Sequence, residues 1–436
     1  MKQWIRKVIL YLTVLAVCIS LFGAISVQGA ESYRWYGPAW TYDTPDEARN
    51  YDMNEENRAG VAVGGYIYLK YGSDYEEETE DCTIEYQWSA SNLNVRVDVQ
   101  SDQTSAKITG NRVGTARVTV TAIYKKADGT EENQRVKTMD LQVTKPRLKN
   151  SKIGLVIYNE AKIELTGNSS YGADHILYAA DRTSNFYVSS GGSVSGYAKQ
   201  TRKVFVFVDG ITLTACVKCT NPSIREGYVV QKGKSVSYKV RGASGYTPVT
   251  YKTGNSKYAS VSKSGTVKGR RYGKTSLTIK VDGATAKFDV YVVKANAYKA
   301  VTKAQSICKS KPKYSQKKRM KKGYVDCSSF VWKAYKSGKV NFGSKSYAPT
   351  AADIAKWCSK KKKLLKLSSY NKKSAKLKPG DLIFYKKRSG KNGRYKNIDH
   401  VAMYIGNDTI VHADGRSVSY SYPWYRKAAA IARPVK

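Results

Sequence analysis

Apolar and polar residues alternate with a period of two through much of the chain between residues 60 and 294. Residues 116–120 and 276–281 show the alternation clearly, and an Asp-Gly pair directly follows the second of these segments. A period of two places the apolar side chains on one face of a strand, and Asp-Gly is a frequent hairpin turn. The pattern therefore predicts half-buried antiparallel strands joined by tight turns.

The same short segments recur along this region. Residues 192–196 (GSVSG) and 265–269 (GTVKG) are 73 positions apart, and the Val-Asp-Gly of 208–210 matches that of 281–283 at the same offset. A looser copy at 108–114 lies 159 positions before its counterpart in the last unit. Three units of roughly 70–85 residues, each with short strands and frequent turns, predict β-sandwiches in a row.

These units resemble the bacterial immunoglobulin-like modules of surface and wall proteins. The resemblance is clearest in the segment 260–269 (SVSKSGTVKG) and covers about residues 60–294. We expect modules at 60–146, 147–221 and 222–294. The resemblance implies spacing or wall adhesion, and it assigns no site to a single residue.

The first thirty residues have the order of a secretory signal peptide. Basic residues precede an almost entirely apolar stretch, 8–27, and a small residue, Ala30, ends it. We expect a signal peptide over 1–30 and a secreted protein associated with the cell wall or surface. An uncleaved membrane anchor is the alternative, because about twenty apolar residues can span a bilayer. Residues 31–59 carry many Asp, Glu and Asn and are expected to be an acidic leader.

The last part of the chain, residues 295–436, changes to helical spacing around a cysteine. Asp326 is a good N-cap, and an apolar stripe begins at Phe330 and ends before Gly338. Cys327 therefore falls in the first turn of a helix, where the macrodipole and free N–H groups favour a thiolate. A lone cysteine can also be a small buried hydrophobic residue, but this position indicates a nucleophile.

Two histidines lie on strand patterns farther along. Residues 399–405 and 409–413 are apolar segments separated by a polar turn, with His400 in the first and His412 in the second. An odd number of residues in the turn would place both imidazoles on the same face. His400 would then activate Cys327, and His412 would orient His400 and select its tautomer.

These residues resemble the NlpC-type cell-wall cysteine peptidases, a bacterial branch of the papain-like enzymes. The matching segments, in the family's order, are 326–330 (DCSSF), 378–384 (KPGDLIF), 400–406 (HVAMYIG) and 410–413 (IVHA). The resemblance runs from about residue 296 to the C-terminus. It implies a multidomain chain, in which tandem all-β immunoglobulin-like sandwiches precede an α+β papain-like cysteine peptidase domain.

The resemblance also implies the chemistry. Cys327, His400 and His412 are the expected catalytic residues. Members of this family cleave peptidoglycan stem peptides, typically between D-γ-glutamate and the following diamino acid, and no metal or other cofactor is expected.

Tyr314 and Ser328 are the candidates for oxyanion or substrate binding. Tyr314 resembles an upstream tyrosine of the family whose hydroxyl lies near the nucleophile, and backbone N–H groups nearby would supply the rest of an oxyanion hole. The glycine pair that usually follows this tyrosine is replaced here by residues 315–319 (SQKKR). We expect Arg319 to be a solvated loop residue and Asp326 to be a helix cap rather than an acid.

Charge is distributed unevenly along a chain whose net charge is +41. Residues 295–436 hold thirty-five Lys and Arg against six Asp and no Glu, whereas residues 31–81 hold thirteen Asp and Glu against four Lys and Arg. A secreted protein seldom meets nucleic acid as a physiological ligand. The expected partners of the basic domain are therefore stem peptides and anionic cell-wall polymers, with no nucleic acid, and we expect a monomer.

Cysteine usage fits an exported protein that does not depend on disulfides. Cys18 lies in the expected signal peptide. The sequence leaves open any pairing among the other cysteines apart from the expected nucleophile, which are Cys82, Cys216, Cys219, Cys308 and Cys358. The Cys-x-x-Cys of 216–219 lies in an alternating strand pattern, whose third neighbour points to the opposite face, so we expect a structural role.

Two other functions stay open. An N-acetylmuramoyl-L-alanine amidase could use the same fold and the same residues. A wall-binding or adhesion protein could use the cysteine fold without catalysis, although a pure binder would have no need of Cys327, His400 and His412 together.

Overall fold

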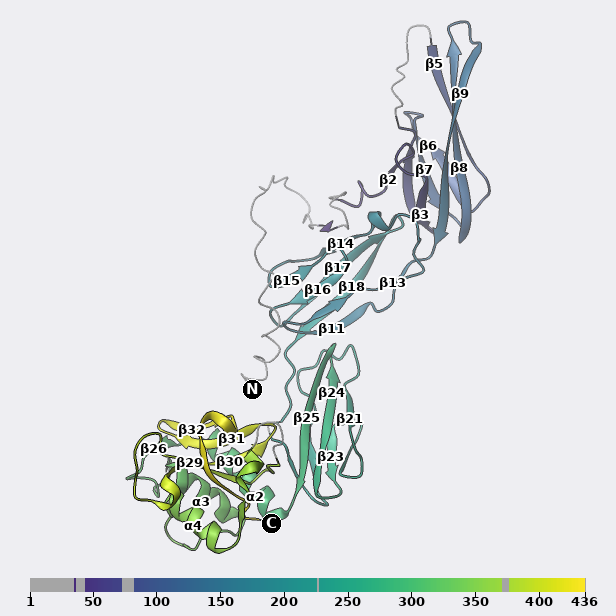
Figure 1. Cartoon of the computed structure of the whole chain (residues 1–436). Helices are drawn as coiled ribbons and strands as arrows, with labels where there is room; N and C mark the ends of the chain where they lie inside the picture. The colour runs from purple at the N-terminus through teal and green to yellow at the C-terminus, as the bar shows by residue number, and fades with distance from the viewer. Residues whose placement is uncertain (1–34, 37–43, 73–81, 226, 371–375, 436) are drawn as a thin grey trace.

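The computed structural model describes residues 35–36, 44–72, 82–225, 227–370 and 376–435. Over these residues, three β-sandwiches follow one another, and a domain of helices and strands lies at the C-terminal end (Figure 1). The expected signal peptide, 1–30, lies outside the described residues. Within them, no helix is both long enough and apolar enough to cross a membrane.

The first sandwich is built from two facing sheets. One has the order β3-β9-β8-β5, with bounds Arg58–Ala62, Glu131–Thr144, Gly114–Lys126 and Cys82–Ala90. The other has the order β2-β4-β7-β6, with bounds Asn50–Asp52, Tyr66–Lys70, Ser105–Gly110 and Val95–Val99. Alternate residues of β8, such as Val118 and Val120, are fully buried in the core between them. β2 lies within the expected acidic leader, so this part of the leader is folded into the sandwich.

The second sandwich repeats this plan. Its larger sheet has the order β1-β14-β17-β18-β11, with bounds Trp35–Tyr36, Leu177–Ala180, Gln200–Val208, Ile211–Thr220 and Lys152–Val156. The facing sheet has the order β12-β16-β15, with bounds Glu160–Lys162, Ser193–Gly196 and Phe186–Val188. The pair β10-β13, Arg147–Leu148 with Leu165–Thr166, and the 3₁₀ helix η1, Ala173–His175, complete it.

The third sandwich has the sheets β19-β25-β24-β21 and β20-β23-β22. Their bounds are Val229–Gln231, Ala284–Val293, Gly273–Val281 and Thr250–Thr253 for the first, and Ser235–Ser237, Thr266–Gly269 and Ala259–Val261 for the second. In all three sandwiches an early strand runs parallel to the last one: β3 with β9, β11 with β18 and β19 with β25. The repeats found in the sequence fall on β16 and β23, which are the middle strands of equivalent sheets.

The C-terminal domain places helices against a curled sheet. The helices are α2, Ala295–Lys309, α3, Cys327–Ser337, and α4, Ala351–Lys360. The sheet has the order β27-β26-β32-β31-β30-β29-β33-β28, with bounds Tyr324–Val325, Lys313–Tyr314, Ser417–Ser421, Thr409–Asp414, Ile398–Gly406, Leu382–Lys386, Ala428–Ala432 and Leu364–Leu365. Short 3₁₀ helices are η2, Leu367–Tyr370, η3, Tyr395–Asn397, and η4, Pro423–Tyr425. The multidomain fold class predicted from the sequence is confirmed.

The third sandwich and the C-terminal domain share one hydrophobic core. Val229 and Tyr291 of the sandwich pack in the same buried cluster as Val301 of α2 and Ile405 of β30. At the rim of this core, the Asn407 side-chain amide accepts from the Asp289 N–H (2.7 Å) and donates to the Asp289 carbonyl (2.8 Å). These are the two backbone hydrogen bonds that a paired neighbouring strand would make with this residue. This packing holds the two units together.

The junction between the first and second sandwiches is made by the aspartate of an Asp-Gly turn. Asp209, between β17 and β18, accepts a hydrogen bond from the Thr144 hydroxyl at the end of β9 (2.6 Å) and one from the Ser169 N–H (2.7 Å). Its backbone carbonyl accepts from the Ala62 N–H of β3 (2.7 Å). Asp209 is buried, and burial raises the pKa of its carboxyl group.

The junction between the second and third sandwiches is made in the same way. Asp282, between β24 and β25, accepts from the Thr220 hydroxyl at the end of β18 (2.7 Å) and from the Ser244 N–H (2.8 Å). Its carbonyl accepts from the Val156 N–H of β11 (3.2 Å). The turn that closes a hairpin in one module therefore also binds the end of the preceding module.

We expect Asp282→Ala to lower the free energy of unfolding of the joined second and third sandwiches by about 2–4 kcal/mol, because each buried donor that loses its acceptor costs about 1–3 kcal/mol. The measurement is the midpoint of the first thermal transition, together with the rate of tryptic cleavage between the second and third sandwiches. Asp128→Ala is the matched control: Asp128 stands in the equivalent β8–β9 turn of the first sandwich and is exposed. It should change stability by less than about 0.5 kcal/mol. Equal losses from both variants would show that Asp282 does not join the modules.

Candidate active site

Helix α3 begins at the cysteine because a capping box precedes it. Asp326 accepts from the Ser329 N–H (2.7 Å), and the Ser329 hydroxyl accepts from the Asp326 N–H (2.9 Å). This reciprocal pair satisfies two backbone donors that a helix start would otherwise leave open. Cys327 is the first residue of the helix, is 7% exposed and is a free thiol. The prediction of a helix that starts at Asp326 and Cys327 is confirmed.

The β30–β31 hairpin brings the two histidines together. Its turn consists of Asn407 and Asp408, both with positive φ, and the pairing shifts by one residue just before it. A two-residue turn alone would put His400 and His412 on opposite faces, and the extra bulge residue puts them on the same face. His400 Nε2 lies 2.9 Å from His412 Nδ1. The predicted shared face is confirmed, but it arises from a bulge rather than from a longer turn.

The sulfur of Cys327 lies against the start of β30. Sγ is 3.9 Å from the carbonyl oxygen of Asp399, the residue before His400. Since Nε2 of His400 is engaged with the second histidine, Nδ1 is the nitrogen that it can offer to the thiol. The N–H groups of Val401 and Ser328 interact with the sulfur and lower the pKa of the thiol. The structure thus brings the predicted nucleophile and the predicted histidine pair to one place.

Burial disfavours the charged forms of both the thiol and the imidazole. It raises the pKa of Cys327 to about 12, and the Asp326 carboxylate adds to this rise. Burial also lowers the pKa of His400 well below its usual value, as do the neighbouring His412 and Arg426. At neutral pH the resting pair is therefore a thiol beside a neutral imidazole. Burial therefore opposes the thiolate that the helix N-terminus is expected to favour.

Arg319 is buried beside the N-terminus of α3, so the prediction of a solvated loop residue is wrong. Its guanidinium donates to Asp326 Oδ2 (2.8 Å), to the Ser328 hydroxyl (3.1 Å) and to the Ala348 carbonyl. The ring of Tyr347 lies 4.9 Å from the guanidinium carbon. Arg319 therefore balances the charge of the capping aspartate next to the nucleophile.

Tyr314 and Ser328 both interact with the thiol. Tyr314 ends β26 and is half-buried; burial raises its pKa, and Cys327 raises it further, so the two groups are close enough to interact. The Ser328 hydroxyl donates to Asp326 Oδ1 (3.3 Å) and accepts from Arg319. The side chain of Ser328 is thus held inside the domain, and its backbone N–H is the group that it offers to the sulfur.

The sequence analysis missed Tyr425. This residue ends η4, and its hydroxyl lies 3.2 Å from His412 Nδ1. The next residue, Arg426, binds the Asp399 carboxylate at 2.6 Å. The feature of the sequence that could have pointed to Tyr425 is the aromatic segment 420–425 (YSYPWY). Which of its rings reaches a histidine depends on the tertiary fold.

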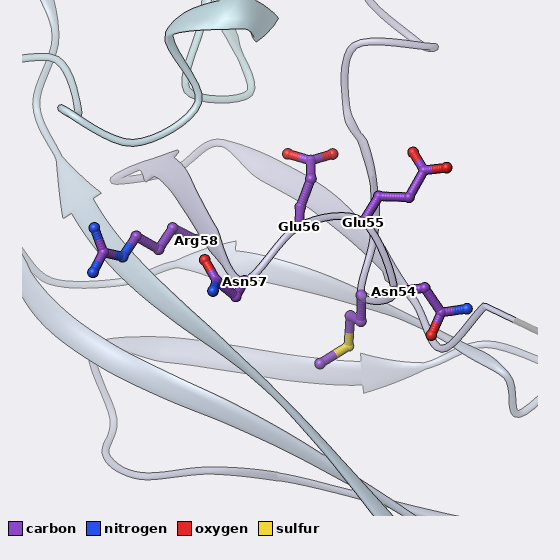
Figure 2. A pocket seen from close by; sticks show the side chains of 6 residues that line it. Asn54, Glu55, Glu56, Asn57 and Arg58 are labelled. Carbon is purple, nitrogen blue, oxygen red and sulfur yellow. The ribbon is translucent and has the colours of Figure 1, made fainter. Parts of the chain in front are cut away.

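A hollow in the first sandwich lacks the thiol and imidazole groups of the candidate site. It is a shallow space lined by Met53 and by residues 54–58, between β2 and β3 of the first sandwich, and its volume is about 280 Å³. Figure 2 shows the carboxylates of Glu55 and Glu56 projecting from this loop. Glu56 binds His175 of the second sandwich at 3.0 Å, which is a contact between modules. No cysteine or histidine lines this hollow, so the C-terminal domain remains the candidate site.

Solved structures with similar sandwiches show low similarity over large parts of the chain. A three-domain segment of titin (I67–I69) is 11% identical, with a TM-score of 0.19, and the match covers 55% of this chain and 96% of that one. Domains 3–5 of Drosophila OTK are 12% identical, with a TM-score of 0.18 and coverage of 61% and 98%. Invasin, a bacterial integrin-binding protein, is 11% identical, with a TM-score of 0.22 and coverage of 61% and 60%.

No curated protein matches the chain. The model of the NlpC/P60 family matches residues 312–430, a span that holds the thiol, both histidines, Tyr314 and Tyr425. The C-terminal domain of this chain is therefore similar to the NlpC/P60 family.

Proposed function

We propose that this protein is a secreted peptidoglycan hydrolase, a cysteine endopeptidase that cleaves stem peptides at the bond between D-γ-glutamate and the following diamino acid. Similarity to the NlpC/P60 family supports a cell-wall peptidase. The observation that carries the proposal is the meeting of Cys327, at the start of α3, with the hydrogen-bonded pair of His400 and His412.

The first half of the reaction starts from the neutral pair. Cys327 attacks the amide carbonyl carbon while the thiol proton moves to Nδ1 of His400. The imidazolium formed in this step keeps its Nε2–H bond to His412. The carbonyl oxygen becomes an oxyanion, for which the Ser328 N–H and the Tyr314 hydroxyl are the nearest candidate donors. His400 then returns the proton to the leaving nitrogen, the C–N bond breaks and a thioester remains.

The second half releases the acyl group. A water molecule gives a proton to Nδ1 of His400 and attacks the thioester carbonyl. The C–S bond breaks, the carboxylic acid leaves, and the sulfur takes the proton back from the imidazolium. Every proton is transferred through Nδ1 of His400, so its proton at rest must be on Nε2.

The rest of the chain suits work on a cell wall. The basic C-terminal domain would be concentrated at anionic wall polymers by long-range attraction, which steers an enzyme without defining its substrate. The three sandwiches would set the distance between the enzyme and whatever holds the N-terminal end, or would themselves adhere to the wall. Export by a signal peptide over residues 1–30 is part of the same proposal.

Other uses of the fold give different products. An N-acetylmuramoyl-L-alanine amidase would release whole stem peptides from the sugar. A wall-binding protein would bind without cleaving. The buried histidine pair favours an enzyme over a binder, because a binding surface does not need two hydrogen-bonded imidazoles beside a thiol.

Digestion of purified peptidoglycan by residues 31–436 tests the reaction. We expect fragments cut after D-γ-glutamate, and a loss of at least about 10³-fold in rate for Cys327→Ala, because that variant lacks the nucleophile. Mass spectrometry of the soluble fragments identifies the bond. Cys358→Ala is a matched control, since Cys358 is a buried cysteine of α4, away from the histidines. Whole stems in the soluble fraction would instead establish the amidase, and equal cleavage by the Cys327 variant would exclude a thiol mechanism.

The protonation state of the resting pair predicts how the thiol reacts with iodoacetamide. Because burial holds the pKa of Cys327 at about 12, the alkylation rate should rise about tenfold per pH unit between pH 6 and 9. His400→Ala should leave alkylation at neutral pH nearly unchanged while it abolishes hydrolysis. His400, with its lowered pKa, should remain a neutral base and sustain hydrolysis below pH 6. An alkylation rate that is fast and flat from pH 5 to 8 would show a preformed thiolate–imidazolium pair instead.

A further inference from the structure

We propose that Tyr425 is a positioning residue for the histidine pair: its hydroxyl donates to His412 Nδ1, which keeps that nitrogen free of a proton and so places the proton of His400 on Nε2. The inference rests on the proposed cysteine peptidase function and adds to it a residue that selects the tautomer. Tyr425 acts through His412, which lies within hydrogen-bond distance of its hydroxyl.

The fold holds Tyr425 firmly in place. It stands in η4, and the buried hydroxyl of Tyr385 donates to the carbonyl of Pro423 in the same short helix (2.8 Å). The Tyr385 ring packs edge-on against the Tyr425 ring, with centroids 4.9 Å apart. The Tyr425 ring in turn lies 5.1 Å from the His412 ring. The position of the hydroxyl is therefore set by packing and not by the hydrogen bond alone.

The tyrosine hydroxyl keeps a proton that it can donate. Burial raises the pKa of Tyr425, and the nearby charge of Arg426 lowers it by less, so the phenol is protonated at neutral pH. His412 Nδ1 lies 3.2 Å from this hydroxyl, within hydrogen-bond distance. Arg426 has only donors, so it cannot accept the tyrosine proton.

The nitrogen at the centre of this arrangement is Nδ1 of His412, which carries either a free lone pair or a proton. His412 Nδ1 faces both His400 Nε2 (2.9 Å) and the Tyr425 hydroxyl (3.2 Å). If it is unprotonated, both neighbours can donate to it. If His412 Nδ1 carries the proton, it must donate to one of these two neighbours. Donation to His400 Nε2 would require His400 to carry its own proton on Nδ1, the nitrogen that faces the thiol. A hydroxyl that donates to His412 Nδ1 disfavours this protonated state of His412 Nδ1.

The choice of tautomer matters because the pair rests neutral. A neutral His400 with its proton on Nδ1 cannot take the thiol proton, whereas one with its proton on Nε2 can. Burial and Arg426 lower the pKa of both His400 and His412, and Asp414 raises that of His412, so these effects decide whether each imidazole is charged. The hydrogen bond from Tyr425 acts on a different choice, which is the nitrogen of His412 that carries the proton.

Nitrogen NMR tests this directly, because the chain has only three histidines. In ¹⁵N-histidine-labelled protein, residues 31–436, we expect His412 to show an unprotonated Nδ1 and a protonated Nε2 at neutral pH. In Tyr425→Phe, which keeps the ring, we expect the Nδ1-protonated form of His412 to become populated. His175, between the first two sandwiches, serves as an internal reference whose signals should not move. A protonated Nδ1 on His412 in the unmodified protein would overturn the proposal, as would identical His412 signals in both proteins.

Kinetics gives a second readout. We expect Tyr425→Phe to lower kcat about five- to tenfold with KM unchanged, which is the effect of one net hydrogen bond. Tyr422→Phe is the matched control, because Tyr422 lies on the same segment, is 54% exposed and has its ring 6.4 Å from that of Tyr425. It should leave kcat unchanged. Equal rates for Tyr425→Phe and the unmodified protein would overturn the proposal while leaving the endopeptidase intact. If the unmodified protein cleaves no wall peptide, the proposed function fails, and the NMR comparison still decides the role of Tyr425.

Discussion

The hydrogen bond between His400 Nε2 and His412 Nδ1 is the constraint on which the site depends. It joins two buried imidazoles and decides which nitrogen of His400 faces the thiol. That bond exists because one extra residue in β30 rotates the two histidines onto a common face. A regular two-residue hairpin made from the same residues would separate them. The chemistry proposed for the domain therefore follows from a backbone irregularity at the far end of the hairpin.

Desolvation is the second constraint, and it changes how the site works. Helix α3 presents its N-terminus to Cys327, and N–H groups interact with the sulfur, yet burial has the larger effect and raises the pKa of the thiol. Arg319 also bears on this balance, because it pairs with the capping aspartate whose negative charge raises the pKa of the thiol. The site is therefore arranged for proton transfer during attack. Orientation of the base counts for more there than a permanent charge on the nucleophile.

The sequence predicted those parts of the structure that depend on near neighbours. The N-cap at Asp326, the start of α3 and the alternating strands follow from local spacing, as does the Asp282-Gly283 hairpin turn. Contacts between distant segments could not be predicted in this way. The burial of Arg319 requires the Ala348 carbonyl and the Tyr347 ring, and the role of Tyr425 requires Tyr385 beneath it. A bulged hairpin is one of the possibilities that the turn sequence allows, but the sequence could not fix it, because the same residues also fit a regular two-residue turn.

A turn residue with positive φ occurs at every junction between the folded units along this chain. Asp209 and Asp282 use a carboxylate to bind the end of the preceding sandwich, and Asn407 uses its amide to pair with the backbone of β25. The last of these turns belongs to β30–β31, the hairpin that carries both histidines. Because Asn407 and the shared core around Tyr291 tie this hairpin to the third sandwich, the sandwich supports the element on which the histidine pair is built. The catalytic hairpin is therefore packed and hydrogen-bonded onto the third sandwich at the end opposite to its histidines.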